Sequence, residues 1–489
     1  KFTNGFWLVR DEFQADYVRD IYEVEERENE LLAFAPYKQI QGRGDTLNIG
    51  MMTYTFTAPA KDILGIHMVN HAGNYVKSPS FELYGDLDKS PERKCEKASG
   101  KEKWTLKSGK LSLEFETGSP EMKFYGDGRE LTCIKSKTTG MMHHKQGMNY
   151  LVSGLNLGVG ELVYGLGERF TPMVKNGQTV DIWNEDGGTA SEISYKNIPF
   201  YYTTKGYGVF VNHPGRVSFE VGSEKVETVQ FSVEDEELEY FVIYGPTPLE
   251  IIEKYTALTG RPALPPKWSF GLWLTTSFTT NYDEATVNSF IDGFEQRHIP
   301  LSVFHFDCFW MKGFEWCNFT WDKDMFPDPA GMLERFHKRG LKICVWINPY
   351  IAQKSPLFGE AMEKGYLLMK DNGRVWQWDM WQAGMGLVDF TNPDACSWYQ
   401  SKLKALLDVG VDCFKTDFGE RVPTNVKWFD GSDPEKMHNY YTYLYNQCVF
   451  ELLKKEKGES EAVLFARSAA PGGQKFPVQI GRASCRERV

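Results

Sequence analysis

The segment Ala405–Arg421, ALLDVGVDCFKTDFGER, decides the fold class of the second half of the chain. It leads from the end of an expected helix, Ala395–Val409, into the short stretch CFKTDF and then into a polar loop. A short apolar run directly after a helix is typical of a buried strand in a parallel sheet. The segment therefore predicts a sheet whose strands are joined by helices.

The same alternation extends on both sides of this segment, from the proline-rich stretch Gly260–Trp268 onward. The expected strands are SFGLWL, LSVFHFD, KICVWIN, CFKTDF and AVLFARS. The expected helices are DEATVNSFIDGFEQRH, PAGMLERFHKRG, Ala395–Val409 and Pro434–Lys457. Five such strands fit either an incomplete (β/α)8 barrel or a doubly wound sheet. Because no GxGxxG motif opens the first unit, the nucleotide-binding form of the doubly wound sheet lacks its fingerprint, and the barrel is preferred.

Residues 1–245 have a different pattern, made of short alternating segments between Gly, Asn and Asp residues. Alternation over five to eight residues, bounded by turn residues, is typical of half-buried strands, and many such segments predict a β-sandwich. The Asp-Gly pair in GDGREL predicts a tight hairpin. We therefore expect a β-sandwich over 1–245 and the first five to six units of a barrel over 246–478, with 479–489 as a tail.

Composition narrows the class of protein. The chain has 489 residues, of which 42% are hydrophobic and 25% charged, with a net charge of -11. This acidic balance argues against nucleic-acid binding, and no apolar run reaches the length of a membrane helix. Neither the nine cysteines nor the nine histidines show zinc-ligand spacing, so we expect no metal and no cofactor. The chain shows no signal segment, which favours a cytoplasmic location.

Residues 350–392 form a connection that is long for a loop between a strand and a helix of a barrel. They contain a hairpin-like piece with three tryptophans, Trp376, Trp378 and Trp381. Long loops at the carboxyl ends of barrel strands are usually functional. We interpret this stretch as a subdomain inserted after the third strand.

Polar residues follow the expected strands at their carboxyl ends, where barrel enzymes carry their catalytic groups. They are Asp307, Asn348, Lys415, Asp417 and Arg467. Strand side chains alternate, so Lys415 and Asp417 share one face while Thr416 points away. A nearby ammonium favours an ionised carboxylate, as a nucleophile requires. A buried Lys–Asp pair with a purely structural role, and Asp307 as a helix cap, remain alternative interpretations.

Aromatic residues accompany these polar groups, namely Phe278, Phe309, Trp346 and Phe418. Carbohydrates are held by carboxylate and guanidinium groups at their hydroxyls and by flat rings at their C–H faces. Taken alone, each of these residues is better explained by packing in a barrel core. Together with the polar strand ends they predict a sugar-binding site.

Several long motifs resemble glycoside hydrolase family 31, and within it the bacterial α-xylosidase branch. They are GVGELVYGLGERF, NIPFY, GRPALPPKWSFGLWLTTSFTTNYDE, FHFDCFWM, KICVWINPYI, CFKTDFGER, MHNYY and LFARS. The resemblance extends to about Val478. It implies an N-terminal β-sandwich, a (β/α)8 barrel with a subdomain inserted after strand 3, and C-terminal β-domains. It also implies metal-free, retaining hydrolysis of α-glycosides from the non-reducing end.

The resemblance assigns roles to individual residues. Asp417 matches the nucleophile, and Lys415, in place of the tryptophan of the α-glucosidase branch, marks the xylosidase branch. Asp307, Trp346 and Arg467 match substrate-holding positions. Asp186, in the loop WNEDGG, matches a residue that reaches the site from the N-terminal domain. With Phe278 and Phe418, these residues complete the expected substrate contacts.

Xylose lacks the hydroxymethyl arm of glucose, so a site that fills the space of this arm would reject glucose by steric clash. Cys308 and Phe309 follow Asp307 directly and are the candidates to fill it. Steric exclusion of an extra substituent can be strong, whereas one methylene of contact contributes about 1–3 kcal/mol. We therefore expect Phe309 to set a preference for xylosides.

Retaining hydrolysis needs a second carboxyl group, which serves as acid and then as base. The resemblance assigns it to a strand shortly after QKFPV, but the chain continues there as QIGRASCRERV, with Ala483 near the expected position. One interpretation is a natural truncated paralogue; the preferred one is a fragment that lacks the acid/base catalyst and whose last residues come from foreign or frame-shifted DNA. In either case we expect a chain that is poorly soluble and essentially inactive on its own.

Other interpretations stay open at this point. An α-glucosidase, a transglycosylase or an eliminating lyase of the same family would share the nucleophile, and a sugar-binding protein without catalysis would share the site. The expected partner is an α-linked oligosaccharide or xyloside, and the full-length form is a possible homo-oligomer.

Overall fold

The computed structural model describes residues 1–5, 8–73, 78–85, 91–98, 100–186, 191–276 and 283–477. Contacts divide the chain into two compact units. Unit 1 comprises Lys1–Trp183 and Ala190–Gly260, and unit 2 comprises Asn184–Thr189 and Arg261–Val489. Among the described residues, no helix is both long and apolar enough to cross a membrane.

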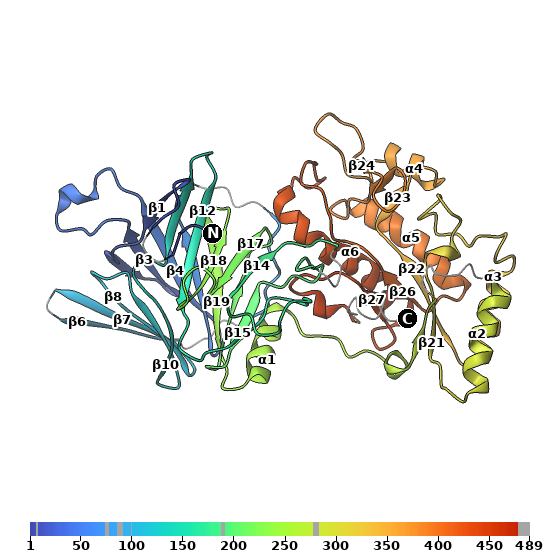
Figure 1. Cartoon of the computed structure of the whole chain (residues 1–489), viewed down its shortest axis with the longest axis horizontal. Helices are drawn as coiled ribbons and strands as arrows, with labels where there is room; N and C mark the ends of the chain where they lie inside the picture. Colours follow the sequence, from blue (N-terminus) through green and yellow to red (C-terminus); the bar gives the residue numbers. More distant parts are fainter. Residues whose placement is uncertain are drawn as a thin grey trace. The chain divides into compact units, whose positions relative to one another are not determined.

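Unit 1 is built from three antiparallel sheets (Figure 1). The first contains, in spatial order, β1 (Phe13–Tyr17), β11 (Gly140–His144), β12 (Asn149–Asn156), β18 (Thr228–Val233), β17 (Val217–Val221) and β14 (Gln178–Ile182). The second contains β10 (Arg129–Ile134), β9 (Met122–Gly126), β8 (Leu111–Glu116), β7 (Lys101–Ser108) and β6 (Glu92–Ala98). The third contains β13 (Val163–Gly165), β15 (Phe200–Thr203), β16 (Tyr207–Val211), β19 (Glu237–Tyr244), β5 (Ile63–Val69), β4 (Met51–Ala60), β3 (Glu30–Pro36) and β2 (Glu23–Glu26). The predicted sandwich is confirmed.

The three sheets share one apolar core, because their inward-facing residues belong to a single cluster. Phe56 of β4, Leu113 of β8 and Phe231 of β18 lie in it and are fully buried. The burial of β4 alternates along the strand, as the polar and apolar alternation in its sequence predicts. The predicted Asp-Gly hairpin joins β9 and β10, with Asp127 and Gly128 both at positive φ.

One α-helix and one 3-10 helix complete the described elements of unit 1. They are α1 (Pro248–Thr259) and η1 (Arg43–Thr46). Helix α1 begins with Thr247 as N-cap, whose side chain accepts a hydrogen bond from Glu250 N, and with Pro248 in the first turn.

Unit 2 contains a parallel five-stranded sheet in chain order, which is the pattern of a barrel in which each strand lies beside the next. Its strands are β20 (Trp273–Leu274), β21 (Val303–Phe306), β22 (Lys342–Ile347), β26 (Cys413–Thr416) and β27 (Leu464–Ala466). The helices that connect them are α2 (Glu284–Gln296), α3 (Pro329–Lys338), α5 (Pro393–Val409) and α6 (Pro434–Lys457). The 3-10 helices are η2 (Lys267–Phe270), η3 (Cys308–Trp310) and η4 (Gly473–Lys475). The curled parallel sheet confirms the prediction of an incomplete (β/α)8 barrel.

The connection after β22 carries a small antiparallel sheet of its own. Its order is β23 (Tyr350–Ala352), β25 (Met385–Leu387) and β24 (Gln377–Trp378), with α4 (Leu357–Glu363) between β23 and β24. This sheet and its helix lie within the long connection, residues 350–392.

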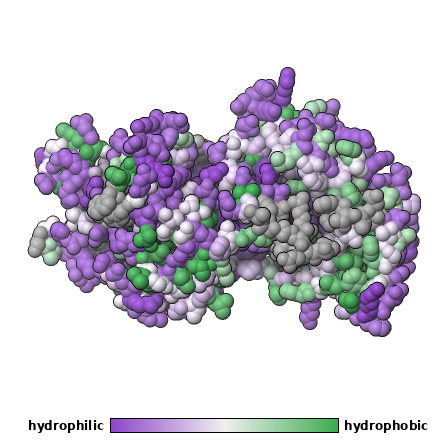
Figure 2. All heavy atoms as spheres, in the orientation of Figure 1, coloured by the Kyte–Doolittle hydropathy of each residue, from purple (hydrophilic) through white to green (hydrophobic). Residues whose placement is uncertain are grey.

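The surface is mixed in character. In the face that Figure 2 shows, hydrophilic residues make up most of the area, and hydrophobic residues lie among them in small groups. Such a mixture is ordinary for globular proteins.

Candidate active site

The parallel strands of unit 2 bring the predicted polar residues to one edge of the sheet. Asp307 follows β21, Asp417 follows β26 and Arg467 follows β27, while Trp346 of β22 is the register partner of Lys415 in β26. Because the strands β21, β22, β26 and β27 are parallel neighbours, their carboxyl ends meet. The remaining strand-end residue, Asn348, is fully buried, and its Oδ1 accepts hydrogen bonds from Tyr350 N and Cys317 Sγ, which is a structural arrangement.

Asp417 is held by contacts from β22 and from the residue that follows β27. Trp346 Nε1 donates a hydrogen bond to Asp417 Oδ2 at 2.7 Å, and Arg467 forms an ion pair with Oδ1 at 3.3 Å. The backbone N–H of Asp417 continues the ladder by donating to Ile347 O at 2.9 Å. Both carboxylate oxygens of Asp417 therefore have charged or polar partners in the described part of the chain.

The environment keeps Asp417 ionised. Burial alone raises its pKa, but the ammonium of Lys415, the guanidinium of Arg467 and the hydrogen bond from Trp346 together lower the pKa to about 2. The two cations and the hydrogen bonds together outweigh the cost of burial. Asp417 is therefore a carboxylate over the whole physiological range, which suits a nucleophile.

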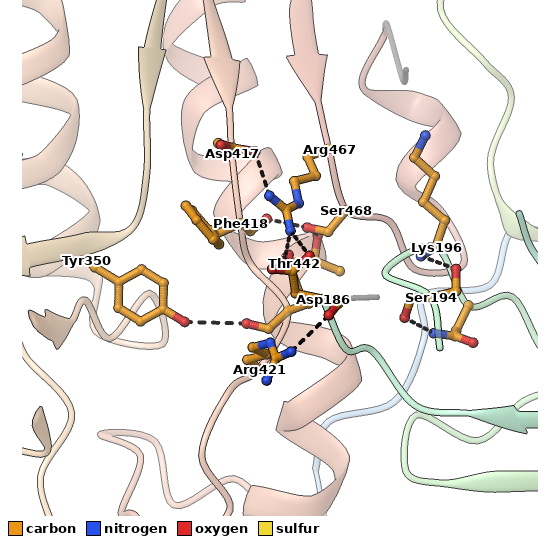
Figure 3. Close-up of polar contacts among 12 residues, drawn as sticks. Asp186, Ser194, Lys196, Tyr350, Asp417, Phe418, Arg421, Thr442, Arg467 and Ser468 are labelled. Atoms are coloured by element: carbon orange, nitrogen blue, oxygen red, sulfur yellow. Dashed lines mark hydrogen bonds and ion pairs between the residues drawn. The ribbon is translucent and has the colours of Figure 1, made fainter. Parts of the chain in front are cut away.

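A sharp turn follows Asp417 and directs the chain away from the strand. Phe418 and Gly419 have φ values of 59° and 98°, in the left-handed region. A side chain at position 419 would place a Cβ 2.7 Å from Ser468 Oγ, so glycine is required there. Ser468 Oγ donates to Phe418 O at 2.6 Å and is also hydrogen-bonded to Thr442 Oγ1, so the ends of β26 and β27 and helix α6 are tied together (Figure 3).

Arg467 joins three carboxyl groups. Its NH1 faces Asp417, and its NH2 lies 2.6 Å from Glu420 Oε1 and 2.6 Å from Asp186 Oδ1. In Figure 3 the guanidinium lies between Asp417 on one side and Asp186 on the other. The planar guanidinium also lies over the aromatic ring of Phe418, with its central carbon 4.6 Å from the ring centroid.

Glu420 is the residue that the sequence analysis missed. It is fully buried, and its Oε2 has no hydrogen-bond partner in the described part of the chain. Burial raises its pKa, Arg467 lowers it, and the negative charges of Asp186 and Asp417 raise it further, to about 7. Its position three residues after Asp417, in the same strand-end loop, is the signal that could have identified it.

Asp186 belongs to the barrel unit although it lies among the strands of unit 1 in the sequence. The segment is anchored to α6, since Asn184 N donates to Asn439 Oδ1 at 2.9 Å and a ring nitrogen of His438 lies 2.8 Å from Asn184 O. Arg421 donates to the backbone oxygen of Asp186 at 2.8 Å. These contacts hold Asp186 beside Arg467.

Asp307 makes two contacts, and the first of them is the helix cap that the sequence analysis named as an alternative to substrate binding. Its Oδ1 accepts a hydrogen bond from Cys308 N at 2.8 Å and so caps η3, while its Oδ2 lies 3.6 Å from Lys415 Nζ. Lys415 therefore lies between two carboxylates, Asp307 and Asp417, as the alternation of strand side chains predicts. Thr416 points to the other face, where its hydroxyl contacts Asn446 of α6 at 2.7 Å.

Cys308 and Phe309 differ in their exposure. Cys308 is buried beside Asp307, and burial together with this carboxylate raises the pKa of its thiol well above the usual value. Phe309 is half-buried and packs edge-on against Trp316, with ring centroids 5.8 Å apart, and Trp316 in turn contacts Trp346. Phe278 lies outside the described residues.

The arrangement can hold a neutral, hydroxyl-rich ligand beside an ionised carboxylate. Asp307, Asp186, Lys415 and Arg467 offer hydrogen-bonding and charged groups, and the aromatic rings offer flat apolar faces. His305 contributes no charge, because burial and the nearby Lys415 lower its pKa to about 3. Within the described ranges, no group of three or more His, Cys, Asp or Glu residues is placed to hold a metal ion.

Two family models match the chain. The glycosyl hydrolases family 31 TIM-barrel domain matches residues 262–481, and the glycosyl hydrolase 31 N-terminal galactose mutarotase-like domain matches residues 53–220.

Curated relatives match over almost the whole chain. The chain is 55% identical over 472 residues to the α-xylosidase XylQ of Lactiplantibacillus pentosus, covering 96% of this chain and 61% of that protein. It is 49% identical over 501 residues to an α-xylosidase of Emericella nidulans, covering 98% of this chain and 64% of that protein. The chain thus spans less than two thirds of the length of these relatives.

Solved structures share the fold. The dextranase of Flavobacterium johnsoniae complexed with glucose superimposes with a TM-score of 0.83 at 23% identity, covering 95% of this chain and 56% of that one. An α-xylosidase from a soil metagenome complexed with xylose gives a TM-score of 0.75 at 18% identity, covering 93% and 66%. The family models, the close relatives and the fold agree, and the chain therefore belongs to glycosyl hydrolase family 31.

Proposed function

We propose that the protein is a retaining, exo-acting α-glycoside hydrolase that releases xylose from the non-reducing ends of α-xylosides. The observation that carries this proposal is the buried Asp417 carboxylate, held ionised between Lys415, Arg467 and Trp346. The identity of 55% and 49% to two α-xylosidases supports xylose as the sugar.

In the first step, an Asp417 oxygen attacks the anomeric carbon of the sugar. The bond between this carbon and the glycosidic oxygen breaks, and a second carboxyl group donates a proton to the departing oxygen. The product is a glycosyl ester on Asp417 and a free alcohol. In the second step, water gives a proton to the same second group and attacks the anomeric carbon, which releases the sugar and restores the Asp417 carboxylate.

The second carboxyl group is not Glu420, because this side chain is fully buried and bound to Arg467. The resemblance assigns the acid to the segment after Gln474–Val478, and residues from Val478 onward lie outside the described part of the chain.

The remaining polar groups suit the binding of the sugar. In this proposal Asp307, Lys415, Asp186 and Arg467 receive its hydroxyls, and Trp346 lines the site beside the nucleophile. Phe309 and Cys308 occupy the space that the hydroxymethyl arm of glucose would need. Phe309 is partly exposed, so its ring is available to a ligand, whereas the buried Cys308 acts behind it.

The test compares an aryl α-xyloside with the corresponding aryl α-glucoside, using the full-length protein. We expect a higher kcat/KM for the xyloside than for the glucoside. Phe309→Ala is expected to reduce the ratio of these two kcat/KM values, because it opens space for the hydroxymethyl arm of glucose. The first-formed sugar, observed by NMR before mutarotation, is expected to be the α-anomer.

Other outcomes would overturn parts of the proposal. A preference for the glucoside indicates an α-glucosidase, and a β-anomer as first product contradicts the retaining mechanism. Transfer of the sugar to an added acceptor in preference to water indicates a transglycosylase. Binding of xylose without turnover of any α-glycoside would indicate a sugar-binding protein.

A further inference from the structure

Helices α5 and α6 bring together two cysteines that are far apart in the sequence. Cys396 lies near the beginning of α5, and Cys448 lies in the second half of α6, 52 positions later. Cys448 Sγ lies 3.8 Å from Cys396 O. Gln400, one turn after Cys396, donates a hydrogen bond from Nε2 to Cys448 O at 2.7 Å. These contacts fix Cys448 beside Cys396.

The two thiols of this pair differ in their acidity. A hydrogen bond with the Cys448 thiol lowers the pKa of the Cys396 thiol, although burial and the charges of Glu451 and Asp389 oppose this shift. Burial raises the pKa of the Cys448 thiol well above its ordinary value. Cys396 is therefore the better thiolate of the two, and the thiolate is the form of cysteine that reacts with oxidants.

The two thiols also differ in their access to solvent. Cys396 is half-buried, whereas Cys448 is 2% exposed. A small oxidant in solution therefore reaches Cys396 first. An accessible thiol of lowered pKa with a second thiol directly behind it is the arrangement of a reactive cysteine and its resolving cysteine.

A second pair of cysteines in unit 2 shows that proximity alone does not give this arrangement. Cys344 of β22 and Cys413 of β26 are register partners in the parallel sheet, and both are 0% exposed. Burial raises the pKa of the Cys413 thiol well above its ordinary value. This second pair is closed to solvent, so we expect it to stay reduced under conditions that oxidise Cys396.

We propose that Cys396 and Cys448 are a site of reversible disulfide formation whose oxidant is a peroxide. The sulfur of Cys396 attacks one oxygen of hydrogen peroxide, the O–O bond breaks, and a sulfenic acid and one water are formed. The sulfur of Cys448 then attacks the sulfur of the sulfenic acid, and the S–O bond breaks. The hydroxyl group leaves as a second water with the proton of Cys448. The two thiols together lose two electrons and two protons, which the peroxide takes up.

The disulfide joins two helices that support the candidate active site. Tyr399 of α5 donates a hydrogen bond from its hydroxyl to Asn348 O, and Thr416 of β26 contacts Asn446 of α6. A cross-link between positions 52 residues apart restricts the unfolded chain and so stabilises the folded one. Oxidation therefore adds a covalent staple behind the strand ends. This inference does not depend on the proposed glycosidase activity.

Peptide mapping of the full-length protein tests the site directly. The protein is exposed to a small excess of hydrogen peroxide and then unfolded, its remaining thiols are alkylated, and it is digested without reduction. We expect mass spectrometry to find one peptide that contains Cys396 joined to one that contains Cys448, and to find them separate after treatment with dithiothreitol. Cys344 and Cys413 in the same sample are expected to be alkylated, which makes them the internal control.

Two variants separate the roles of the two thiols. Cys448→Ala is expected to stop at the sulfenic acid of Cys396, which dimedone traps, whereas Cys396→Ala is expected to give no dimedone adduct at Cys448. Peroxide is expected to raise the Tm of the unaltered protein by about 5 °C and that of neither variant. Circular dichroism before the treatment shows that each variant is folded.

Three results would overturn the inference. Cys396 that remains a free thiol while peroxide oxidises an added small-molecule thiol shows that it is not reactive. Oxidation of Cys396 to a sulfinic acid with Cys448 still free shows that Cys448 does not resolve it. A Cys344–Cys413 cross-link at the same dose shows that access to solvent does not select the pair.

Discussion

The interior of the sandwich in unit 1 and the strand ends of unit 2 bury different kinds of side chain. The sandwich core is formed by apolar residues such as Phe56, Leu113 and Phe231, all fully buried. The strand ends of unit 2 bury carboxyl groups and cations side by side, with Asp417, Glu420 and Lys415 at most 9% exposed. Apolar burial stabilises a fold, whereas buried ion pairs contribute little net stability and are expensive to break. The difference agrees with the proposed function, in which the strand ends carry the chemistry and the sandwich core provides stability.

The largest expected effect is the loss of activity in Asp417→Asn. The amide is a poor nucleophile and cannot form the glycosyl ester, so kcat for an aryl α-xyloside is expected to fall by about four orders of magnitude. Its thermal unfolding is expected to change far less than its activity. A variant that retains a tenth of the activity would show that Asp417 is not the nucleophile.

The opposite behaviour is expected in the sandwich core. Phe231→Ala removes a buried ring that packs edge-on against Tyr240 with centroids 5.0 Å apart, and is expected to lower the free energy of unfolding by about 3–5 kcal/mol. Denaturant titration measures this loss, and Phe231→Leu serves as the milder control. At temperatures where the variant is folded, its kcat is expected to equal that of the unaltered protein. A fall in kcat of the folded variant would contradict the division of roles.

Lys415→Met tests the electrostatic support of the nucleophile. Without this ammonium the pKa of Asp417 rises from about 2, so the loss of activity on the acid side shifts to higher pH. We expect kcat/KM to fall about 100-fold at neutral pH, since the contact to Asp307 and the proposed contact to the sugar are also lost. Lys404→Met is the matched control, because Lys404 is half exposed and pairs with Asp408 on the surface of α5. If the pH at which kcat/KM falls on the acid side were the same in Lys415→Met as in the unaltered protein, Lys415 would be excluded as a group that lowers the pKa of Asp417.

The smallest expected effect concerns Glu420 and the pH dependence of stability. In the folded protein the pKa of Glu420 is raised from an ordinary value of 4.5 to about 7. Between pH 4.5 and pH 7 the folded state therefore keeps a proton on Glu420 that the unfolded state has already released. Stability from this group is therefore fully present below pH 4.5 and is lost as the pH rises through 7, by on the order of 3 kcal/mol. The glutamine in Glu420→Gln cannot titrate, so the free energy of unfolding of this variant is expected to change less with pH between 4.5 and 7. Urea titrations at several pH values measure the free energy of unfolding, with Glu363→Gln as the control because Glu363 is exposed. If the pH dependence of the free energy of unfolding were the same in Glu420→Gln as in the unaltered protein, the raised pKa of Glu420 would be contradicted.

Much of the barrel unit could be predicted because its signals are local. The helix expected over Pro434–Lys457 is α6 with the same bounds, since Asp433 caps it and Pro434 opens its first turn. The parallel strands followed from short apolar runs between helices, and the meeting of Asp307, Asp417 and Arg467 followed from their position after those strands.

What the sequence pattern could not predict depends on contacts between distant segments. The pairing of Arg467 with Glu420 requires the turn at Gly419, and the packing of Trp381 against Trp346 requires the fold of the inserted subdomain. Asp186 was identified only through the resemblance to the family, because its place beside Arg467 comes from hydrogen bonds to α6 that join residues more than 250 positions apart. No local propensity encodes such contacts.

The most direct test of the account is to trap the covalent intermediate in the full-length protein. A 5-fluoro-xylosyl fluoride slows both steps and lets the glycosyl ester accumulate, and digestion followed by mass spectrometry locates it. The account predicts one fluoroxylosyl group on the peptide that contains Asp417, and none in Asp417→Asn. A fluoroxylosyl group on another carboxylate, or turnover of the reagent with no covalent adduct at any time, would contradict it.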